Sequence, residues 1–301
     1  MKKRRAYVSF PTEYGNTPQT LAHQKRIDGV NIRFTTKVYS DAGNPASASF
    51  TIYNLNREDL QFLSTSAATW LQKQNLIQLY AGYDDEVELL ASGQITEAIP
   101  EGNPDVGLSV RLISGLQWYG QNIELQKDNI TIRELLKDCA RTMGFTYNEP
   151  AYLESNEWLN KVVPNFSFTG TPYQELSTIQ AMCGGFNSDG DGLNIVSGVG
   201  EITVWSPNPQ ANASVLLVSK ETGMVGYPQP TAAGVQVKIL LDPTVRPGDV
   251  IEVQSVRTPF INGQYYITSI QHEGELRGNN WYSTLTCSRM SGYKYGVENE
   301  Q

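Results

Sequence analysis

The feature that most constrains this chain is a period-of-two alternation of apolar and polar residues in two long regions. In the first region the alternating runs cover residues 30–34, 48–55, 76–83, 89–95 and 107–113. In the second they cover residues 235–241, 250–253, 263–270 and 281–287. Successive strand residues point to opposite faces of a sheet, so the alternation predicts half-buried antiparallel strands. Runs rich in Gly, Pro, Asn and Asp, such as 41–45, separate them as turns. Each region is therefore predicted to form a small β-barrel or sandwich.

The residues between these regions have helical patterns. Thr131 followed three residues later by Glu134 is a capping box, and Thr171 with Gln174 repeats it, with Pro172 at the first helical position. Apolar residues at helical spacing follow each box, and glycines end both patterns. A hairpin over 193–196 and 201–205 completes a compact α+β unit. A short helical turn is also expected at Asn56–Leu60.

These patterns predict a mainly β fold in which two small β-barrel-like domains bracket a helix-containing α+β domain. We expect an N-terminal arm at 1–26, a first β-barrel-like domain at 27–120 and the α+β domain at 121–214. A second β-barrel-like domain follows at 215–290, and a C-terminal tail at 291–301. The order β, α+β, β allows a diverged duplication, although no clear sequence repeat is present.

The chain is acidic, and this bears on its partners. With 23 Lys and Arg against 31 Asp and Glu, the formal net charge is −8. A general nucleic-acid binder needs clustered basic residues, and the one dense basic cluster is Lys2–Arg5. The residues after it lack the apolar stretch of about 7–15 residues typical of a signal peptide. No run approaches the ~20 apolar residues of a membrane span. We therefore expect a chain made and kept in the cytoplasm until assembly.

The cysteines indicate no redox chemistry. Cys139 and Cys183 fall in helical patterns beside apolar residues, and Cys287 falls in a strand pattern. Their number is odd, and no pair has CxxC spacing. Buried free thiols are expected.

Motifs for nucleophilic catalysis, phosphate binding and zinc are missing from the sequence. The two histidines are His23 and His272, and no Gly-x-Ser-x-Gly elbow is present. We expect His272, between Gln271 and Glu273, to be a polar surface residue. Residues 187–192 match the start of a calcium loop, but Gly198 stands where the bidentate Glu belongs, so a turn is expected. We therefore assign no catalytic, cofactor-binding or metal-binding residue and expect no cofactor.

Two weaker functional signals leave alternatives open. Asp84-Asp85-Glu86 is the densest acidic cluster, and it is expected at a solvated hairpin tip; paired carboxylates of a glycan hydrolase can be any two acids that meet in a fold. The aromatic residues are spread over all regions, which favours core or subunit-interface roles over a carbohydrate platform. These aromatic residues are Trp70, Trp118, Tyr119, Trp158, Trp205, Trp281 and Tyr282.

The order and spacing of several motifs resemble one known family. Residues 48–55, 76–83 and 91–95 look like the first domain of phage baseplate hub proteins, the late-control-protein-like tail hubs. Residues 234–243, Arg246-Pro-Gly-Asp-Val-Ile251, 262–265, 272–274 and Gly278-Asn-Asn-Trp-Tyr282 resemble the terminal domain of the same family. The resemblance covers roughly residues 27–290. The cell-wall-degrading domain of some tail-tip proteins has no counterpart here, and residues 1–26 match no known pattern.

The resemblance implies a structural protein of the virion rather than an enzyme. Such hubs form a homotrimeric ring at the tail baseplate, whose two barrel domains per subunit present a pseudo-sixfold face to the tail tube or tube-initiator proteins. The other face carries the central spike protein, and the tape measure protein is a further candidate partner. DNA would pass through the central channel without specific binding, and an acidic lumen would repel its phosphates. The alternatives are a tip-associated cell-wall glycan hydrolase with paired carboxylates and a carbohydrate-binding β module.

Overall fold

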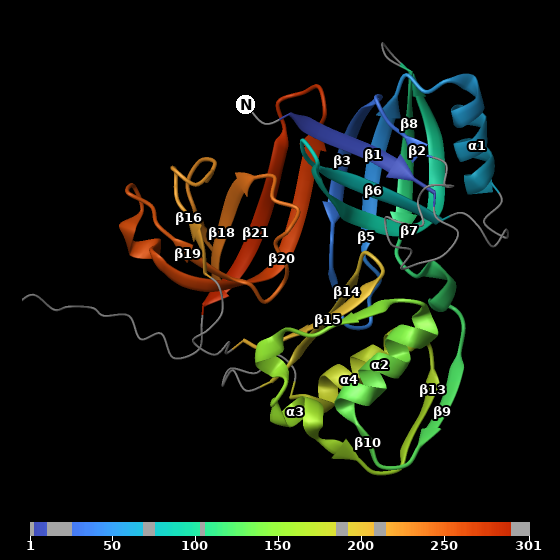
Figure 1. Ribbon diagram of the computed structural model, residues 1–301, viewed down its shortest axis with the longest axis vertical. Coiled ribbons are helices and arrows are strands. Elements are labelled where there is room, and N and C mark those ends of the chain that lie inside the picture. The colour runs from blue at the N-terminus through green and yellow to red at the C-terminus, as the bar shows by residue number, and fades with distance from the viewer. Residues whose placement is uncertain are drawn as a thin grey trace, which may run out of the picture.

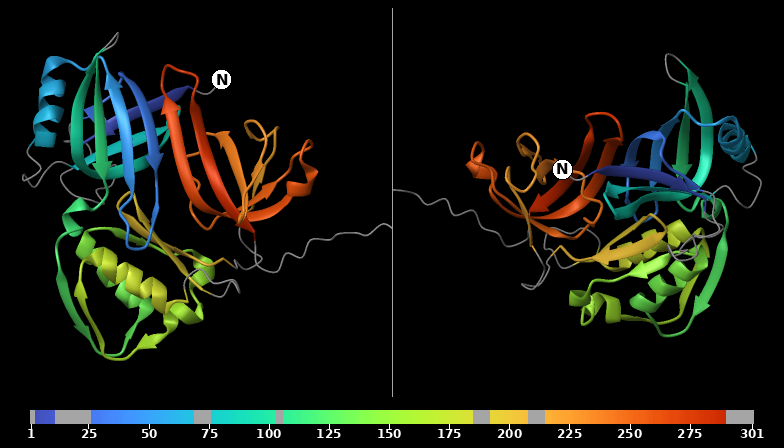
Figure 2. Two further views of the ribbon diagram at one scale, coloured as in Figure 1. Left: turned by 180° about the vertical axis from the view of Figure 1, so that it is seen from behind. Right: turned by 45° about the horizontal axis from the view of Figure 1, so that its top comes forward.

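A computed structural model describes residues 3–10, 26–68, 76–102, 106–184, 192–207 and 215–289. The strands and helices form three groups (Figure 1), which we name the first β unit, the middle unit and the second β unit. The first β unit contains β1–β3 and β5–β8 with α1, the middle unit β9–β15 with α2–α4, and the second β unit β16–β21. Seen from behind as well, the two β units lie side by side and the middle unit lies against one end of both (Figure 2).

The first β unit is an antiparallel sheet in the order β3-β5-β8-β7-β6-β1-β2. Helix α1 packs against β7 at the outer side of this sheet (Figure 1). The bounds are β1 Arg4–Ser9, β2 Arg26–Ile27, β3 Asn31–Lys37, β5 Ser47–Tyr53, α1 Arg57–Ala68, β6 Leu76–Tyr83, β7 Glu86–Gly102 and β8 Val106–Ile113.

Two elements of this unit differ from the expectations. The helical turn predicted at Asn56–Leu60 is the beginning of the longer helix α1, and the Asn56 side chain accepts a hydrogen bond from the Asp59 N–H at 2.7 Å. Strand β1 lies within residues 1–26, where the sequence indicated no element. It pairs with β6 on one edge and β2 on the other, and it buries Ala6 and Val8 in the core.

The second β unit is a curved sheet in which β20 is the central strand. Strand β21 pairs along most of β20, β18 pairs with β21, and β17 pairs with β18; β19 pairs with the beginning of β20, and β16 runs parallel to β19. The bounds are β16 Val215–Val218, β17 Gln229–Pro230, β18 Gly234–Leu240, β19 Val250–Val253, β20 Gly263–Glu275 and β21 Trp281–Arg289.

A single strand connects the two β units. The second half of β20 pairs antiparallel with β3, in a register from Gln271 opposite Lys37 to Glu275 opposite Arg33. The strands of both units therefore belong to one sheet of 13 strands. The prediction of a mainly β fold with a helical insert is confirmed. Among the described residues neither β unit closes into a barrel: β3, at one edge of the first unit, pairs with β20, and the edge strands β16 and β17 of the second unit do not pair with each other.

The middle unit contains the helix pair. Strands β11, β15 and β14 form its main sheet, and β4 (Ser40–Asp41), from the connection between β3 and β5, adds to the edge of β14. The other bounds are β9 Ile123–Lys127, β10 Ile130–Thr131, α2 Ile132–Met143, β11 Thr146–Asn148, α3 Glu157–Asn160, β12 Val162–Val163, β13 Phe166–Gly170, α4 Pro172–Met182, β14 Asn194–Gly198 and β15 Glu201–Trp205. Short 3-10 helices lie at 116–118, 151–153 and 259–261.

The helix boundaries follow the local sequence. Both predicted capping boxes are present: the hydroxyl of Thr131 accepts from the Glu134 N–H, and that of Thr171 accepts from the Gln174 N–H. Gly144, at φ 69°, ends α2 as expected. All three cysteines are buried free thiols, which confirms that prediction. The domain limits given above remain a prediction.

Candidate functional site: the junction of the three units

His272 is not a surface residue, so that expectation is wrong. It is 1% exposed, and its Nδ1 lies 2.8 Å from the Oγ of the fully buried Ser283 on the neighbouring strand β21. Burial, with a smaller contribution from the positive charge of Arg246, lowers the pKa of His272 to about 3. The imidazole is therefore neutral at physiological pH. A histidine and a serine that are both sealed in the core support the sheet, since no substrate reaches them.

The acidic cluster lies at a hairpin tip, as predicted. Asp84 and Asp85 form the turn between β6 and β7 and are exposed. The turn is attached to β1: the Lys3 N–H donates to Asp84 Oδ1 at 2.9 Å, and Arg5 forms an ion pair with Asp85 at 3.1 Å. These carboxylates therefore fix the hairpin against β1.

The other motifs considered for chemistry give no site. Residues 187–191 of the calcium-loop match lie outside the described residues, as do His23 and Trp70. Within the described part of the chain, no group of three or more His, Cys, Asp and Glu side chains is placed to hold a metal ion. The helices in the same part of the chain are all too short or too polar to cross a membrane.

Two tryptophans each connect one unit to another. Trp281, at the beginning of β21, is fully buried in the core of the first β unit, with its ring 5.4 Å from that of Phe34 in an edge-to-face arrangement. Trp205, at the end of β15, is 2% exposed and packs in the core of the second β unit, 5.2 Å from the ring of Tyr266. The predicted core role is confirmed for these two residues, and each joins two units.

A cluster of polar groups meets where the three units come together. Tyr39 lies between β3 and β4. Its hydroxyl donates a hydrogen bond to the carboxylate of Glu201, the first residue of β15. Arg246, from the loop before β19, lies 3.8 Å from the same carboxylate. Burial and the adjacent Glu201 carboxylate raise the pKa of Tyr39 well above its usual value, so the hydroxyl keeps its proton and remains a donor.

The loop that carries Arg246 is shaped to fit this junction. The Asp249 carboxylate accepts from the Arg246 N–H at 2.7 Å and closes the turn. Gly248 has φ 91°, and a Cβ there would overlap the Trp205 side chain, 2.7 Å from its Cγ. The Arg-Pro-Gly-Asp motif therefore holds the second β unit against the middle unit through one ion pair and one close contact.

A buried carboxylic acid lies in the middle unit, away from the junction. Glu175, on α4, is 0% exposed and faces α2, where Cys139 and Asp138 are its neighbours, with Lys127 on β9. Burial raises its pKa to about 7, and the Cys139 thiol and the Lys127 ammonium offset this only in part. Glu175 is therefore close to half-ionised at neutral pH.

Sequence reasoning missed Tyr39, Glu201 and Glu175. Glu175 follows a capping box, where an acid in the first turn of a helix is ordinary, so its burial left no sign. Glu201 begins a predicted strand next to a glycine turn, and its partners are far away in the sequence. One signal was available for the junction: the Pro-Gly turn at Pro247-Gly248, because a glycine in a tight turn often marks a close approach.

Several solved structures have a similar fold. Among solved structures, a tail protein from Neisseria meningitidis is similar at a TM-score of 0.58 and 12% identity, covering 95% of this chain and 96% of that one. The 43 kDa tail protein of the prophage MuSo2 from Shewanella oneidensis is similar at 0.55 and 10%, covering 95% and 97%. A component of the type VI secretion system of E. coli is similar at 0.52 and 12%, covering 88% and 75%.

At such low identities these structures establish the fold alone. No curated protein sequence matches the chain. The family model described as "Baseplate hub gp41" matches residues 20–287, which include the whole junction and all three units except β1 and the last two residues of β21. The resemblance expected from the sequence is thereby confirmed, and the chain belongs to the baseplate hub gp41 family.

Proposed function

We propose that three copies of this chain form a ring with a central channel at the tip of a phage tail. Membership of a baseplate hub family makes the chain a structural component of the tail. The observation that carries the proposal is the pairing of β20 with β3, which fixes two β units side by side in one sheet. Three such pairs supply six β units around an axis, which suits contact with a hexameric tube. The closed ring would use a head-to-tail contact between unlike surfaces.

The partners follow from the position of a hub in the tail. One face of the ring would bind tail tube or tube-initiator proteins, and the other would carry the central spike, with the tape measure protein as a further candidate. The similar E. coli secretion component is itself described as resembling the T4 tail proteins gp27 and gp5, which supports a hub-and-spike arrangement.

The proposed role in genome passage rests on charge. The net charge of −8 per chain gives a ring of three a formal charge of −24 (3 × −8). Acidic side chains on the channel wall would repel DNA phosphates and let the genome slide without being held. A neutral or basic lumen in the assembled ring would contradict this part of the proposal.

The proposed role is structural rather than catalytic. The junction consists of groups that bind one another, and its tryptophans are buried. Incubating the purified protein with peptidoglycan and measuring released sugars tests the hydrolase alternative, and we expect no release above a buffer control. Release of sugars that stops when a pair of carboxylates is neutralised would replace the structural proposal with an enzymatic one.

The experiment that tests the ring is an image reconstruction of purified tail particles. It is preferable to a mass measurement on the isolated chain, because a hub that assembles on its partners can be monomeric alone. We expect three copies around the tail axis, between tube and spike, with the β units lining the channel. Absence of the chain from particles, or a different copy number, would overturn the proposal.

A further inference from the structure

Strand β16 lies at an edge of the sheet, and its side chains are apolar and partly exposed. Its first three residues, Val215, Leu216 and Leu217, are 42%, 37% and 40% exposed. One edge of β16 pairs with β19. Among the described residues no strand pairs with its other edge, where the Thr222 hydroxyl donates to the Leu217 carbonyl at 2.8 Å. The Leu217 carbonyl is therefore already bonded, but no strand covers this edge, and an apolar strand at the edge of a sheet is a template for the addition of another strand.

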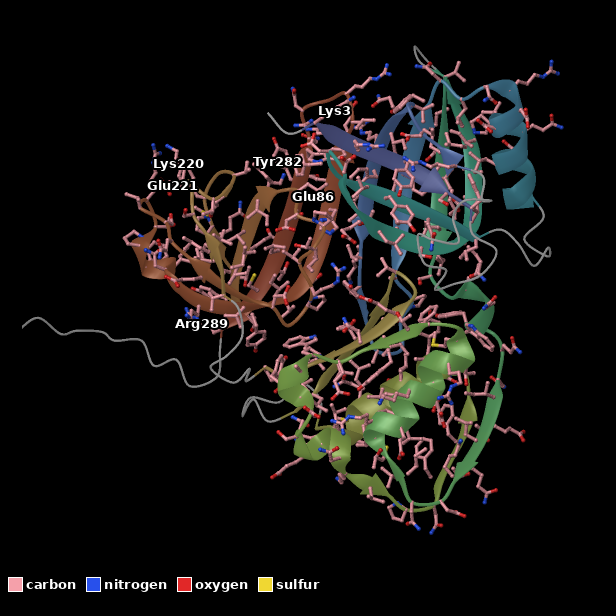
Figure 3. The ribbon with its side chains drawn as sticks, in the orientation of Figure 1. Lys3, Glu86, Lys220, Glu221, Tyr282 and Arg289 are labelled. Carbon is pink, nitrogen blue, oxygen red and sulfur yellow. The ribbon has the colours of Figure 1, made fainter. Side chains whose placement is uncertain are left out.

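This strand forms part of the floor of a groove of about 1020 Å³ between the two β units. The floor is apolar, with Leu216 and Leu217 from β16 and Leu240, which is 50% exposed, from β18. The opposite wall is the β6–β7 hairpin, and Figure 3 shows Glu86 of this hairpin on the side that faces Tyr282 of the second β unit.

The rim of the groove is acidic. Four carboxylates line it, those of Asp85, Glu86, Glu88 and Asp242, against the single basic lining residue Arg4; of the four, Asp85 is ion-paired with Arg5. The Arg4 guanidinium is occupied by the fold: it donates to the Gly278 carbonyl at 2.6 Å and lies 5.5 Å from the centre of the Trp281 ring. The groove therefore presents a net negative charge around an apolar floor.

The β6–β7 hairpin that forms the wall of the groove is held in place by hydrogen bonds to the residue before β1. The Asp84 N–H donates to the Lys3 carbonyl at 2.8 Å, and the Lys3 N–H donates back to Asp84, so the hairpin tip is fastened to β1 on its far side. A binding surface that is rigid before the partner arrives loses little conformational entropy on binding.

We propose that this groove is a docking site for an extended segment of a second protein that carries apolar side chains and a net positive charge. The segment would lie along the open edge of β16 as an added strand, with apolar side chains on the leucine floor and Lys or Arg against the acidic rim. A second copy of this chain fits less well, because it brings the same net charge of −8. The proposal is independent of the ring proposed above.

A pair of matched peptides tests the chemistry of the groove. A fluorescent peptide of alternating lysine and valine is added to the full-length protein, and binding is followed by anisotropy. We expect saturable binding that weakens as salt is raised, and no binding of the matched peptide in which glutamate replaces lysine. Equal binding of the two peptides, or binding of neither, would overturn the proposal.

Variants then locate the binding. Leu217→Lys places a positive charge on the apolar floor, and we expect it to weaken lysine–valine binding at least about tenfold. Val162→Lys is the matched control, because Val162 is 53% exposed on β12 of the middle unit, and it should leave binding unchanged. Val215→Pro removes an edge N–H at the first position of β16, where proline is tolerated, and should weaken binding without a loss of thermal stability. Unchanged affinity in both groove variants would show that the peptide binds elsewhere and overturn the proposal.

The natural occupant is identified in assembled particles with p-benzoylphenylalanine in place of Leu240. A cross-link to a segment of another protein that contains apolar residues and Lys or Arg supports the proposal. A cross-link to another copy of this chain, or within the same copy, overturns it. Either result leaves the ring as a separate question, which the particle reconstruction answers.

Discussion

The hydroxyl of Tyr39 donates to the carboxylate of Glu201, and this hydrogen bond connects the first β unit to the middle unit. Arg246 of the second β unit forms an ion pair with the same carboxylate. Tyr39 is 3% exposed and the Glu201 side chain is 20% exposed, so the bond is partly shielded from water. The three units therefore share a fixed joint rather than hinging freely on their linkers.

Tyr39→Phe tests the strength of this joint. The ring remains and only the donor is lost, so we expect the free energy of unfolding to fall by about 1.5–3 kcal/mol, the usual contribution of a hydrogen bond to a charged group. Urea unfolding followed by tryptophan fluorescence at pH 7 measures it. Tyr119→Phe, at a tyrosine that is 58% exposed, is the control and should change stability little. Equal stability of Tyr39→Phe and the wild type would contradict a structural role for the bond.

Gly274 lies on β20 at the seam between the β units, and its lack of a side chain is required there. A Cβ at this position would overlap the Phe34 ring and lie 2.9 Å from Cε3 of Trp281. We expect Gly274→Ala to destabilise the protein by about 1–3 kcal/mol through overpacking. Gly120→Ala is a suitable comparison, because a Cβ at Gly120 meets nothing within 4 Å. If both substitutions had the same small effect on thermal unfolding, the packing at the seam would be looser than described.

From the burial of His272 we predict that the protein loses stability in acid. Its pKa is about 3 in the folded protein and about 6.5 when unfolded. Below pH 6.5 the unfolded chain takes up a proton that the buried ring does not, so the free energy of unfolding falls as the pH falls toward 3, by up to ~1.4 kcal/mol per pH unit. His272→Gln removes this dependence. The difference in unfolding free energy between the two proteins, measured from pH 7 to pH 5, should therefore change in favour of the variant, and a constant difference would contradict the prediction.

For Glu175 we predict the opposite dependence of stability on pH. Its pKa is raised to about 7 by burial, so between pH 4.5 and 7 the unfolded chain releases a proton that the folded protein retains, and stability falls as the pH rises through this range. Above pH 7 the penalty is complete, at roughly 3 kcal/mol from a shift of this size.

Glu175→Gln keeps the shape and removes the charge. We expect it to stabilise the protein at pH 8 relative to the wild type and to lose most of this advantage at pH 4.5, as measured by chemical unfolding at the two pH values. Glu124→Gln, at an exposed position on β9, should show little difference between them. A pH-independent effect of Glu175→Gln would place the ionisation of Glu175 outside the range argued above.

The helices and most strands could be predicted because their signals are local. A capping box spans four residues, and the alternation of a strand can be counted within the strand itself. Helix α1 was underestimated because Ser64-Thr65-Ser66 follows Leu63 and interrupts the apolar spacing. His272 was misread from its polar neighbours Gln271 and Glu273. Its own face of the strand, with the buried Ile270 two positions before it, pointed to the core.

The junction and the seam could not be predicted, because the alternation of a strand says which face is buried and not which strand lies beside it. Nothing near Tyr39 in the sequence points to Glu201, and nothing near β3 points to β20. The same holds for the groove, whose floor and wall come from different units. The run Val215–Val218 was the available hint, since four consecutive apolar residues suit a strand that is covered on both faces.

The pairing of β3 with β20 also sets an order of events during synthesis. Strand β3 leaves the ribosome more than 200 residues before its partner β20, because β3 ends at Lys37 and β20 begins at Gly263. At about 5–20 residues per second, the open edge of β3 waits on the order of ten seconds or more before β20 is available. During that time β3 is exposed to mispairing with other nascent strands. The two-unit architecture therefore forms only after β20 has been made, and a truncation before β20 would leave a sheet that is competent to aggregate rather than a smaller folded protein.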